Sequence, residues 1–143
     1  MFGENIVLGN TECNVDTKGR IFLPKFSYSE KDDEIVFSVN DDNTILLNNL
    51  VCLKRRINEL EKNISNESDE RLIMSLNNKL ESIYFSCISV SKVDRQRRLI
   101  IPMSIRTEHD ISDSVILQGC GDHLKMFNSS ESYENYKMML KQL

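Results

Sequence analysis

Two short stretches of the chain gather the side chains that could bind an anion. Residues 15–24 read VDTKGRIFLP and residues 93–102 read VDRQRRLIIP, so each has an aspartate followed four residues later by an arginine. A guanidinium can donate two parallel hydrogen bonds to a guanine edge, whereas a lysine serves mainly as a point charge for phosphate. The whole chain has a net charge of -4. Basic loops on an acidic protein indicate an anionic partner.

The two stretches belong to a longer internal repeat. Asp94 stands 78 positions after Asp16 (94 - 16). The similarity continues from IVFSVNDDNTILLNN, which begins at Ile35, to VILQGCGDHLKMFNS, which begins at Val115, once the second copy is given two extra residues. Each copy is predicted to form a short strand, a tight turn, an apolar strand, a helical turn, and two strands joined by a turn. The helical turns are expected to begin at Pro24 and Pro102.

The turn inside each motif follows from strand geometry. At about 3.3 Å per residue, residues four apart in a strand are about 13 Å from each other, so the chain must fold back for Asp16 to reach Arg20. Gly19 can supply a positive φ, and Asp16 can accept backbone N–H groups as in an Asx-turn. In the second copy Arg97 replaces the glycine, so that loop either avoids positive φ or is strained.

Helices are predicted between the copies and at the end of the chain. Residues 50–64 and 73–83 have apolar side chains at spacings of three and four, which predicts a helical hairpin. Ser68 is predicted to cap the second of these helices. A shorter helix is predicted from Ser130 to Gln142. Its inward side chains are predicted to be Tyr133, Tyr136, Met139 and Leu140.

The composition is that of an ordinary globular protein, with 40% hydrophobic and 28% charged residues. The N-terminal MFGENIVLGN has neither the basic region nor the apolar region of an export signal, and no apolar run is long enough to cross a bilayer. We therefore expect a cytoplasmic protein that does not contact membranes. The scattered cysteines are expected to be reduced thiols, with no metal site and no cofactor. They are Cys13, Cys52, Cys87 and Cys120.

Catalysis has one weak candidate pair. Cys120 and His123 lie in or beside the stretch GCGD, at the position that NDDN occupies in the first copy, and this position predicts a turn rather than a phosphate loop. No third group that would orient the pair is evident in the sequence. We therefore expect no enzyme activity, and no small-molecule substrate is evident.

The paired motifs DTKGRIFLP and DRQRRLIIP resemble the duplicated D-x-x-x-R units of the MraZ family of bacterial transcriptional regulators. The resemblance extends over nearly the whole chain, including MFGEN at its start. It implies an α+β fold of two AbrB-like swapped-hairpin halves in one pseudo-twofold β unit. The halves would be residues 1–48 and 87–143, the second with a C-terminal helix, and residues 49–86 would form the helical hairpin between them.

The family resemblance also implies a function. It implies ring-like homo-oligomers that bind short direct repeats of double-stranded DNA upstream of the division and cell-wall gene cluster, and hence a nucleoid-associated protein. The simplest outcome of such binding is repression. The residues predicted to contact DNA are Asp16, Lys18, Arg20, Lys92, Asp94, Arg95, Arg97 and Arg98.

Within this set the side-chain chemistry divides the roles. Arg20 and Arg98 are predicted to read base edges, and Lys18, Arg95 and Arg97 to contact phosphates. Taken singly, each arginine could simply neutralise its aspartate across a turn, a surface pairing of little energetic weight. The duplication favours nucleic acid. The alternative is an AbrB-fold assembly or antitoxin-like interaction module that binds a basic protein through its acidic surface and does not bind DNA.

Overall fold

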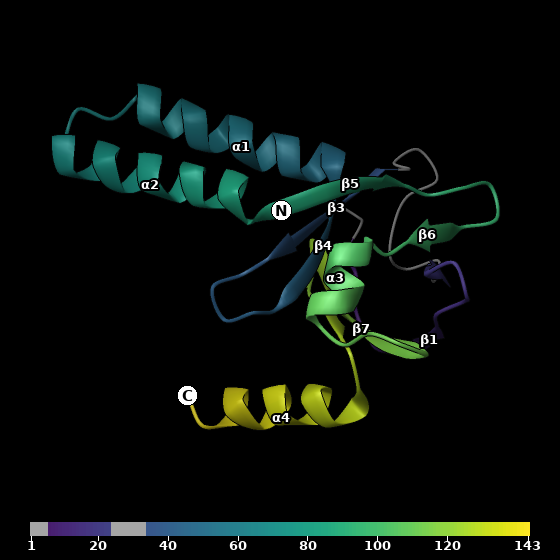
Figure 1. Cartoon of the computed structure of the whole chain (residues 1–143). Helices are drawn as coiled ribbons and strands as arrows, with labels where there is room; N and C mark the ends of the chain where they lie inside the picture. The colour runs from purple at the N-terminus through teal and green to yellow at the C-terminus, as the bar shows by residue number, and fades with distance from the viewer. Residues whose placement is uncertain (1–5, 24–33) are drawn as a thin grey trace.

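The computed structural model describes residues 6–23 and 34–143, and Figure 1 shows their arrangement. The first copy of the repeat contributes β1 (Asn10–Asn14), β2 (Arg20–Phe22), β3 (Glu34–Val39) and β4 (Ile45–Asn49). Two helices follow, α1 (Leu50–Ser65) and α2 (Glu70–Ser86). The second copy contributes β5 (Cys87–Lys92), β6 (Arg98–Ile100), α3 (Met103–Glu108), β7 (Ser114–Gly119), β8 (His123–Phe127) and α4 (Ser130–Lys141). The predicted α+β class is confirmed.

The two copies share one antiparallel sheet. Its strand order is β1-β7-β8-β4-β3-β5, so the first strand of each copy pairs with the other copy, β1 with β7 and β5 with β3. The order is symmetric under exchange of the copies, because β1 and β5, β7 and β3, and β8 and β4 occupy mirrored positions. The remaining strands, β2 and β6, pair with each other as a separate two-stranded ribbon.

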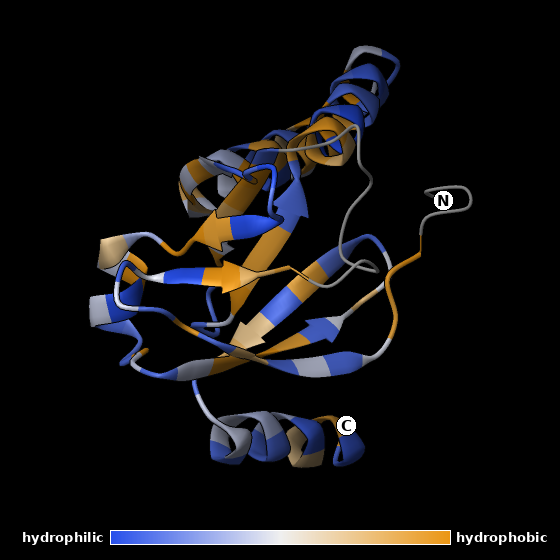
Figure 2. Ribbon diagram, turned by 90° about the vertical axis from the view of Figure 1, so that its right-hand side faces the viewer, coloured by the Kyte–Doolittle hydropathy of each residue, from blue (hydrophilic) through white to orange (hydrophobic). Residues whose placement is uncertain are grey.

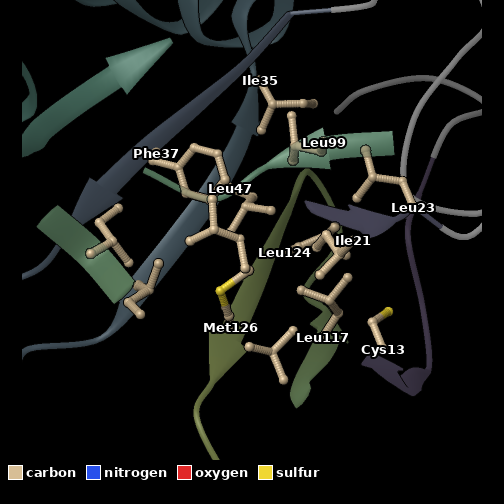
Figure 3. Close-up of a cluster of buried hydrophobic side chains, with 14 of the residues drawn as sticks. Cys13, Ile21, Leu23, Ile35, Phe37, Leu47, Leu99, Leu117, Leu124 and Met126 are labelled. Carbon is tan, nitrogen blue, oxygen red and sulfur yellow. The ribbon is translucent and has the colours of Figure 1, made fainter. Parts of the chain in front are cut away.

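The hydrophobic core lies between the six-stranded sheet and this ribbon (Figure 3). Ile21 of β2 and Leu99 of β6 are directly paired and fully buried, and Phe37 and Leu117 from the sheet are buried with them. Each of these pairs consists of equivalent residues of the two copies. The same apolar positions therefore form the core from both sides, and Figure 2 shows hydrophobic segments recurring along the strands around it.

The repeat alignment made from the sequence is wrong by one residue beyond the last turn. Asn40 N donates to Thr44 O in the first copy, whereas Cys120 N donates to His123 O in the second, so the second turn is one residue shorter. The two extra residues in the second copy correctly align β3 with β7. After the turn the second copy has only one extra residue, so the core residue Ile45 corresponds to Leu124 and Leu47 to Met126.

The predicted helical hairpin is confirmed, and α1 and α2 lie side by side (Figure 1). The predicted cap at Ser68 is wrong by one residue. The Asp69 carboxylate accepts the N–H groups of Arg71 and Leu72, and α2 begins at Glu70. Glu67 Oε1 accepts the backbone N–H groups of Ser68 and Asp69, which holds Ser68 in the turn before the cap.

The C-terminal helix ends one residue earlier than predicted, with Gln142 as its C-cap. Tyr133 is buried, and its ring and that of Tyr136 pack against Phe127. The prediction that Met139 and Leu140 point inward is wrong, since they are 44% and 50% exposed. The two tyrosines therefore hold α4 against Phe127 of β8.

The helical turn predicted after Pro102 is confirmed, although Pro102 is the N-cap of α3 rather than its first residue. The matching prediction for Pro24 lies outside the described residues. None of the four cysteines forms a disulfide. Among the described residues, no helix combines the length and the apolar character that a membrane span requires.

Candidate nucleic-acid interface

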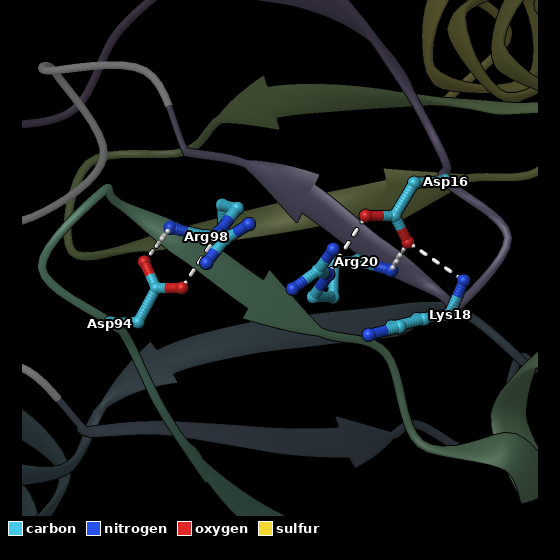
Figure 4. Close-up of polar contacts among 5 residues, drawn as sticks. All are labelled: Asp16, Lys18, Arg20, Asp94 and Arg98. Atoms are coloured by element: carbon cyan, nitrogen blue, oxygen red, sulfur yellow. Dashed lines mark hydrogen bonds and ion pairs between the residues drawn. The ribbon is translucent and has the colours of Figure 1, made fainter.

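The loop before β2 is organised by the Asp16 carboxylate (Figure 4). Asp16 Oδ1 accepts the backbone N–H groups of Lys18 and Arg20, both at 2.9 Å, and Asp16 Oδ2 accepts Arg20 Nε at 2.8 Å. Gly19 closes the turn with a φ of 82° and donates its N–H to Asp16 O. The predicted contact between Asp16 and Arg20 and the predicted Asx-turn are both confirmed.

The loop before β6 repeats this arrangement around Asp94. Asp94 Oδ1 accepts the N–H groups of Gln96 at 2.9 Å and Arg98 at 2.8 Å, and Asp94 Oδ2 accepts Arg98 Nε at 2.7 Å. Arg97 takes the place of Gly19 with a φ of 65°. Of the two alternatives that the sequence left open, the loop therefore adopts positive φ, which is a strained conformation for arginine.

Both aspartates are held in their charged form by these contacts. The backbone N–H of Arg20 is the largest cause that lowers the pKa of Asp16, and the Arg20 guanidinium adds to it. The pKa of Asp94 is lowered in the same way by the N–H and the side chain of Arg98. Each carboxylate accepts the Nε–H of its arginine, which restricts the orientation of the guanidinium, and the two Nη groups carry the remaining donors of that side chain.

The β2–β6 ribbon places both arginines on one surface. Arg20 is opposite Ile100, and Phe22 is opposite Arg98. Successive side chains of a strand point to opposite faces, so Arg20, Phe22, Arg98 and Ile100 form the outer face of the ribbon while the residues between them enter the core. Figure 4 shows the two arginines between the two aspartates, on neighbouring strands. Their side chains are 24% and 27% exposed.

The sequence reasoning missed the two apolar members of this face. Phe22 is 63% exposed and Ile100 is 51% exposed. Both were assigned to apolar strands without a direction. The signal was present in the alternation of RIF and RLI, because the buried residue of each triplet, Ile21 or Leu99, fixes the direction of its two neighbours.

The other predicted contact residues divide into two groups. Lys18, Lys92 and Arg95 are exposed in or beside the loops. Arg97 is only partly exposed, and its Nε donates to the backbone carbonyl of Leu23 at 3.2 Å. Lys18, Lys92 and Arg95 are thus exposed, whereas Arg97, which is half-buried like Arg20 and Arg98, binds the protein backbone.

A second arginine, Arg106, binds a backbone carbonyl beside the Asp16 loop, as Arg97 does beside the Asp94 loop. The sequence reasoning did not select it. Arg106 of α3 donates Nε to the carbonyl of Ile101 at 3.0 Å, and Ile101 is the repeat equivalent of Leu23. The Arg106 guanidinium fills the space beside Gly19, where an added Cβ would lie 2.6 Å from Arg106 Nε. Equivalent carbonyls at the two ends of the ribbon are therefore bound by arginines from different elements.

The pair considered for catalysis has a neighbour that the sequence reasoning overlooked. His123 Nδ1 lies 2.7 Å from Asp122 Oδ1, so a carboxylate that could orient the imidazole is present. Burial, however, raises the pKa of the Cys120 thiol, and its Sγ donates to the carbonyl of Gln118. A raised pKa disfavours the thiolate that a nucleophile requires. In the described part of the chain, no three metal-binding side chains come together.

The fold and the two loops define a class: a duplicated α+β protein in which two aspartate-oriented arginines share one exposed ribbon. No protein-family model matches the chain. Curated relatives do match it, and all four are named transcriptional regulator MraZ. The chain is similar over most of its length to these MraZ proteins.

Three of these relatives show how far the similarity extends. The chain is 26% identical to the relative from Mycoplasmoides gallisepticum over 134 residues, which cover 90% of this chain and 85% of the relative. It is 24% identical to that from Finegoldia magna over 123 residues, covering 86% and 80%. It is 24% identical to that from Halothermothrix orenii over 147 residues, covering 95% and 97%. The similarity thus includes both loops and the helices between them.

Proposed function

We propose that the chain is a sequence-specific DNA-binding transcriptional regulator, acting in the simplest case as a repressor. The observation that carries the proposal is the position of Arg20 and Arg98 on one exposed face, each with its guanidinium oriented by an aspartate. The relatives named transcriptional regulators support the same conclusion. As such a regulator the protein acts in the cytoplasm, in association with the nucleoid.

The geometry supports recognition in the major groove. A two-stranded ribbon fits that groove, which is about 12 Å wide. The Nη groups of Arg20 and Arg98 can then donate to O6 and N7 of guanines, and exposed Lys18, Lys92 and Arg95 can contact the phosphates on either side. Arg20 and Arg98 lie diagonally across the two antiparallel strands, so they can meet different bases of the site.

Affinity then depends on repetition. One ribbon makes few phosphate contacts, and such binding is weak and sensitive to salt. In our proposal the two copies form AbrB-like swapped-hairpin halves, an arrangement supported by the pairing of β1 with β7 and of β5 with β3. Subunits assemble into a ring-like homo-oligomer whose ribbons meet short direct repeats about one helical turn apart, so that each further contact is intramolecular. Bound across the promoter of the division and cell-wall genes, this assembly blocks polymerase.

The test is retention on heparin, and on a DNA fragment from upstream of the chain's own gene, across a salt series. Arg98→Ala and Arg20→Ala are expected to weaken binding to the fragment by about tenfold or more, because each removes a bidentate base contact. Lys18→Ala is expected to lower the salt slope by about one. Arg71→Ala is the matched control, since it removes the same charge from an exposed position on α2.

Light scattering on each variant shows whether the assembly is intact. Loss of binding by Arg98→Ala with unchanged oligomer size supports the proposal. If the wild-type protein does not bind the DNA fragment at low salt, the proposal is refuted. The interaction module that binds a basic protein would then be favoured.

A further inference from the structure

Two large apolar side chains are exposed beside the two arginines of the ribbon. Phe22 is the cross-strand neighbour of Arg98, and Ile100 is the cross-strand neighbour of Arg20. They are 63% and 51% exposed, while the inward positions of the same strands, Ile21 and Leu99, are buried. Phe22 and Ile100 therefore add little to the core, and their presence at the surface needs another explanation.

The repeat argues against a chance origin of this pair. Phe22 and Ile100 are equivalent positions of the two copies (100 - 22 = 78). A strand face turned to solvent normally carries polar residues, as β1 does with Asn10, Glu12 and Asn14, all of them exposed. On the ribbon, both copies instead have a large apolar residue beside an oriented arginine. An apolar surface of this kind, bordered by charges, is typical of a binding site.

We propose that Phe22 and Ile100 contact the C5-methyl groups of thymines in the major groove, and so determine specificity together with the arginines. This inference rests on the proposed DNA-binding function. In the major groove the thymine methyl is the apolar group that the four bases offer to an apolar side chain.

The spacing of the ribbon fits this assignment. Opposite side chains of an antiparallel pair are about 5 Å apart at Cβ, and stacked bases along one strand are separated by about 3.4 Å. If Arg98 donates to a guanine, Phe22 can reach a base of the next base pair, and Ile100 has the same relation to Arg20. The protein therefore selects sites in which thymines lie in the base pairs next to the guanines that the arginines contact.

The experiment compares two versions of the upstream fragment, amplified either with thymidine triphosphate or with deoxyuridine triphosphate. Uracil pairs as thymine does and lacks only the methyl group. Wild type is expected to bind the uracil fragment about fourfold more weakly for each contacted methyl group that the exchange removes. Phe22→Ala and Ile100→Ala are expected to bind the thymine fragment more weakly and to be less sensitive to the exchange. Leu72→Ala, at an α2 residue that is 50% exposed, is the matched control.

The outcomes separate this inference from the function on which it rests. If wild type binds both fragments equally, the methyl contact is refuted while DNA binding stands. Weaker binding by Phe22→Ala without any effect of uracil also refutes it, because the side chain would then act by another contact. If wild type binds neither fragment, the proposed function fails and this inference fails with it. Circular dichroism and light scattering establish that the variants are folded and assembled.

Discussion

The Asp16 loop and the Asp94 loop reach the same backbone geometry with different side chains. Both have an aspartate that accepts two backbone N–H groups, and both have a residue with positive φ three positions later. In the first loop that residue is Gly19, and Arg106 from α3 fills the space beside it and binds Ile101 O. In the second loop it is Arg97, which binds Leu23 O with its own side chain.

The difference shows which feature of the loop is constrained. A backbone carbonyl at each end of the ribbon is bound by a guanidinium, and the source of that guanidinium varies. Where α3 supplies it, the loop needs a residue without a side chain. Where the loop supplies it, the protein accepts an arginine in the left-handed region. One of the positive charges of the second loop, that of Arg97, is therefore bound to the protein backbone rather than turned to solvent.

The largest effect on this comparison is expected from Gly19→Ala. The new Cβ would be strained at a φ of 82° and would displace Arg106 from Ile101 O. We expect a loss of about 2–4 kcal/mol in the free energy of unfolding, measured by urea denaturation.

Gly121→Ala is the matched control for Gly19→Ala. Gly121 has a φ of 83°, and nothing lies within 4 Å of an added Cβ. Gly121→Ala should lower the free energy of unfolding only by the cost of positive φ for alanine, about 1–2 kcal/mol. Introduced into Arg106→Ala, the Gly19→Ala change should also fall to that level. Equal losses for Gly19→Ala and Gly121→Ala in the wild-type background would show that the contact with Arg106 has no energetic weight.

A smaller effect is expected at the second loop from Arg97→Ala. This change removes the bond from Nε to Leu23 O but keeps a Cβ in the strained conformation. We expect it to lower the free energy of unfolding by about 1–2 kcal/mol. Arg97→Gly removes the same bond and relieves the strain, so its loss should be smaller by about 1 kcal/mol. Urea denaturation of both variants measures the difference.

The DNA-binding consequence distinguishes Arg97 from its neighbour. If Arg97 serves the backbone, Arg97→Gly should retain most of the affinity for DNA, whereas Arg95→Ala should lower the salt slope by about one. An Arg97→Gly protein of normal stability with a salt slope reduced as much as that of Arg95→Ala would show that Arg97 contacts phosphate after all.

The parts of this site that depend on near neighbours were predictable from the sequence. The repeat predicted the strands and the turn in each copy, and the limited reach of an extended chain predicted that Asp16 folds back onto Arg20. The helical hairpin followed from its apolar spacing. In each case the determining interactions lie within one turn or one helix.

The parts that depend on distant segments were not predictable. Arg97 could not be placed, because its partner Leu23 is 74 residues away in the sequence. The shared outer face of the ribbon, with Phe22 and Ile100, exists only because β2 pairs with β6. Arg106 likewise gains its role when α3 packs against the loop of the other copy.

The smallest difference between the two loops is expected in acid, where both should contribute equally to the dependence of folding stability on pH. The folded protein lowers the pKa of both Asp16 and Asp94, with the same causes in the same order. Below the ordinary aspartate pKa of about 3.9 the unfolded chain therefore binds protons that the folded chain does not, and stability falls as the pH falls towards the lowered values. Above that range the contribution is constant. Asp16→Asn and Asp94→Asn keep an oxygen for the Asx-turn but cannot titrate. Each should therefore make the loss of stability in acid less steep, and by the same amount.

Asp42→Asn, in the β3–β4 turn, is the comparison outside the loops, because the pKa of Asp42 is lowered mainly by the Thr44 hydroxyl. Urea denaturation between pH 2 and pH 6 measures the slopes, and unequal slopes for the two loop variants would mean that Gly19 and Arg97 do change the electrostatics of their loops.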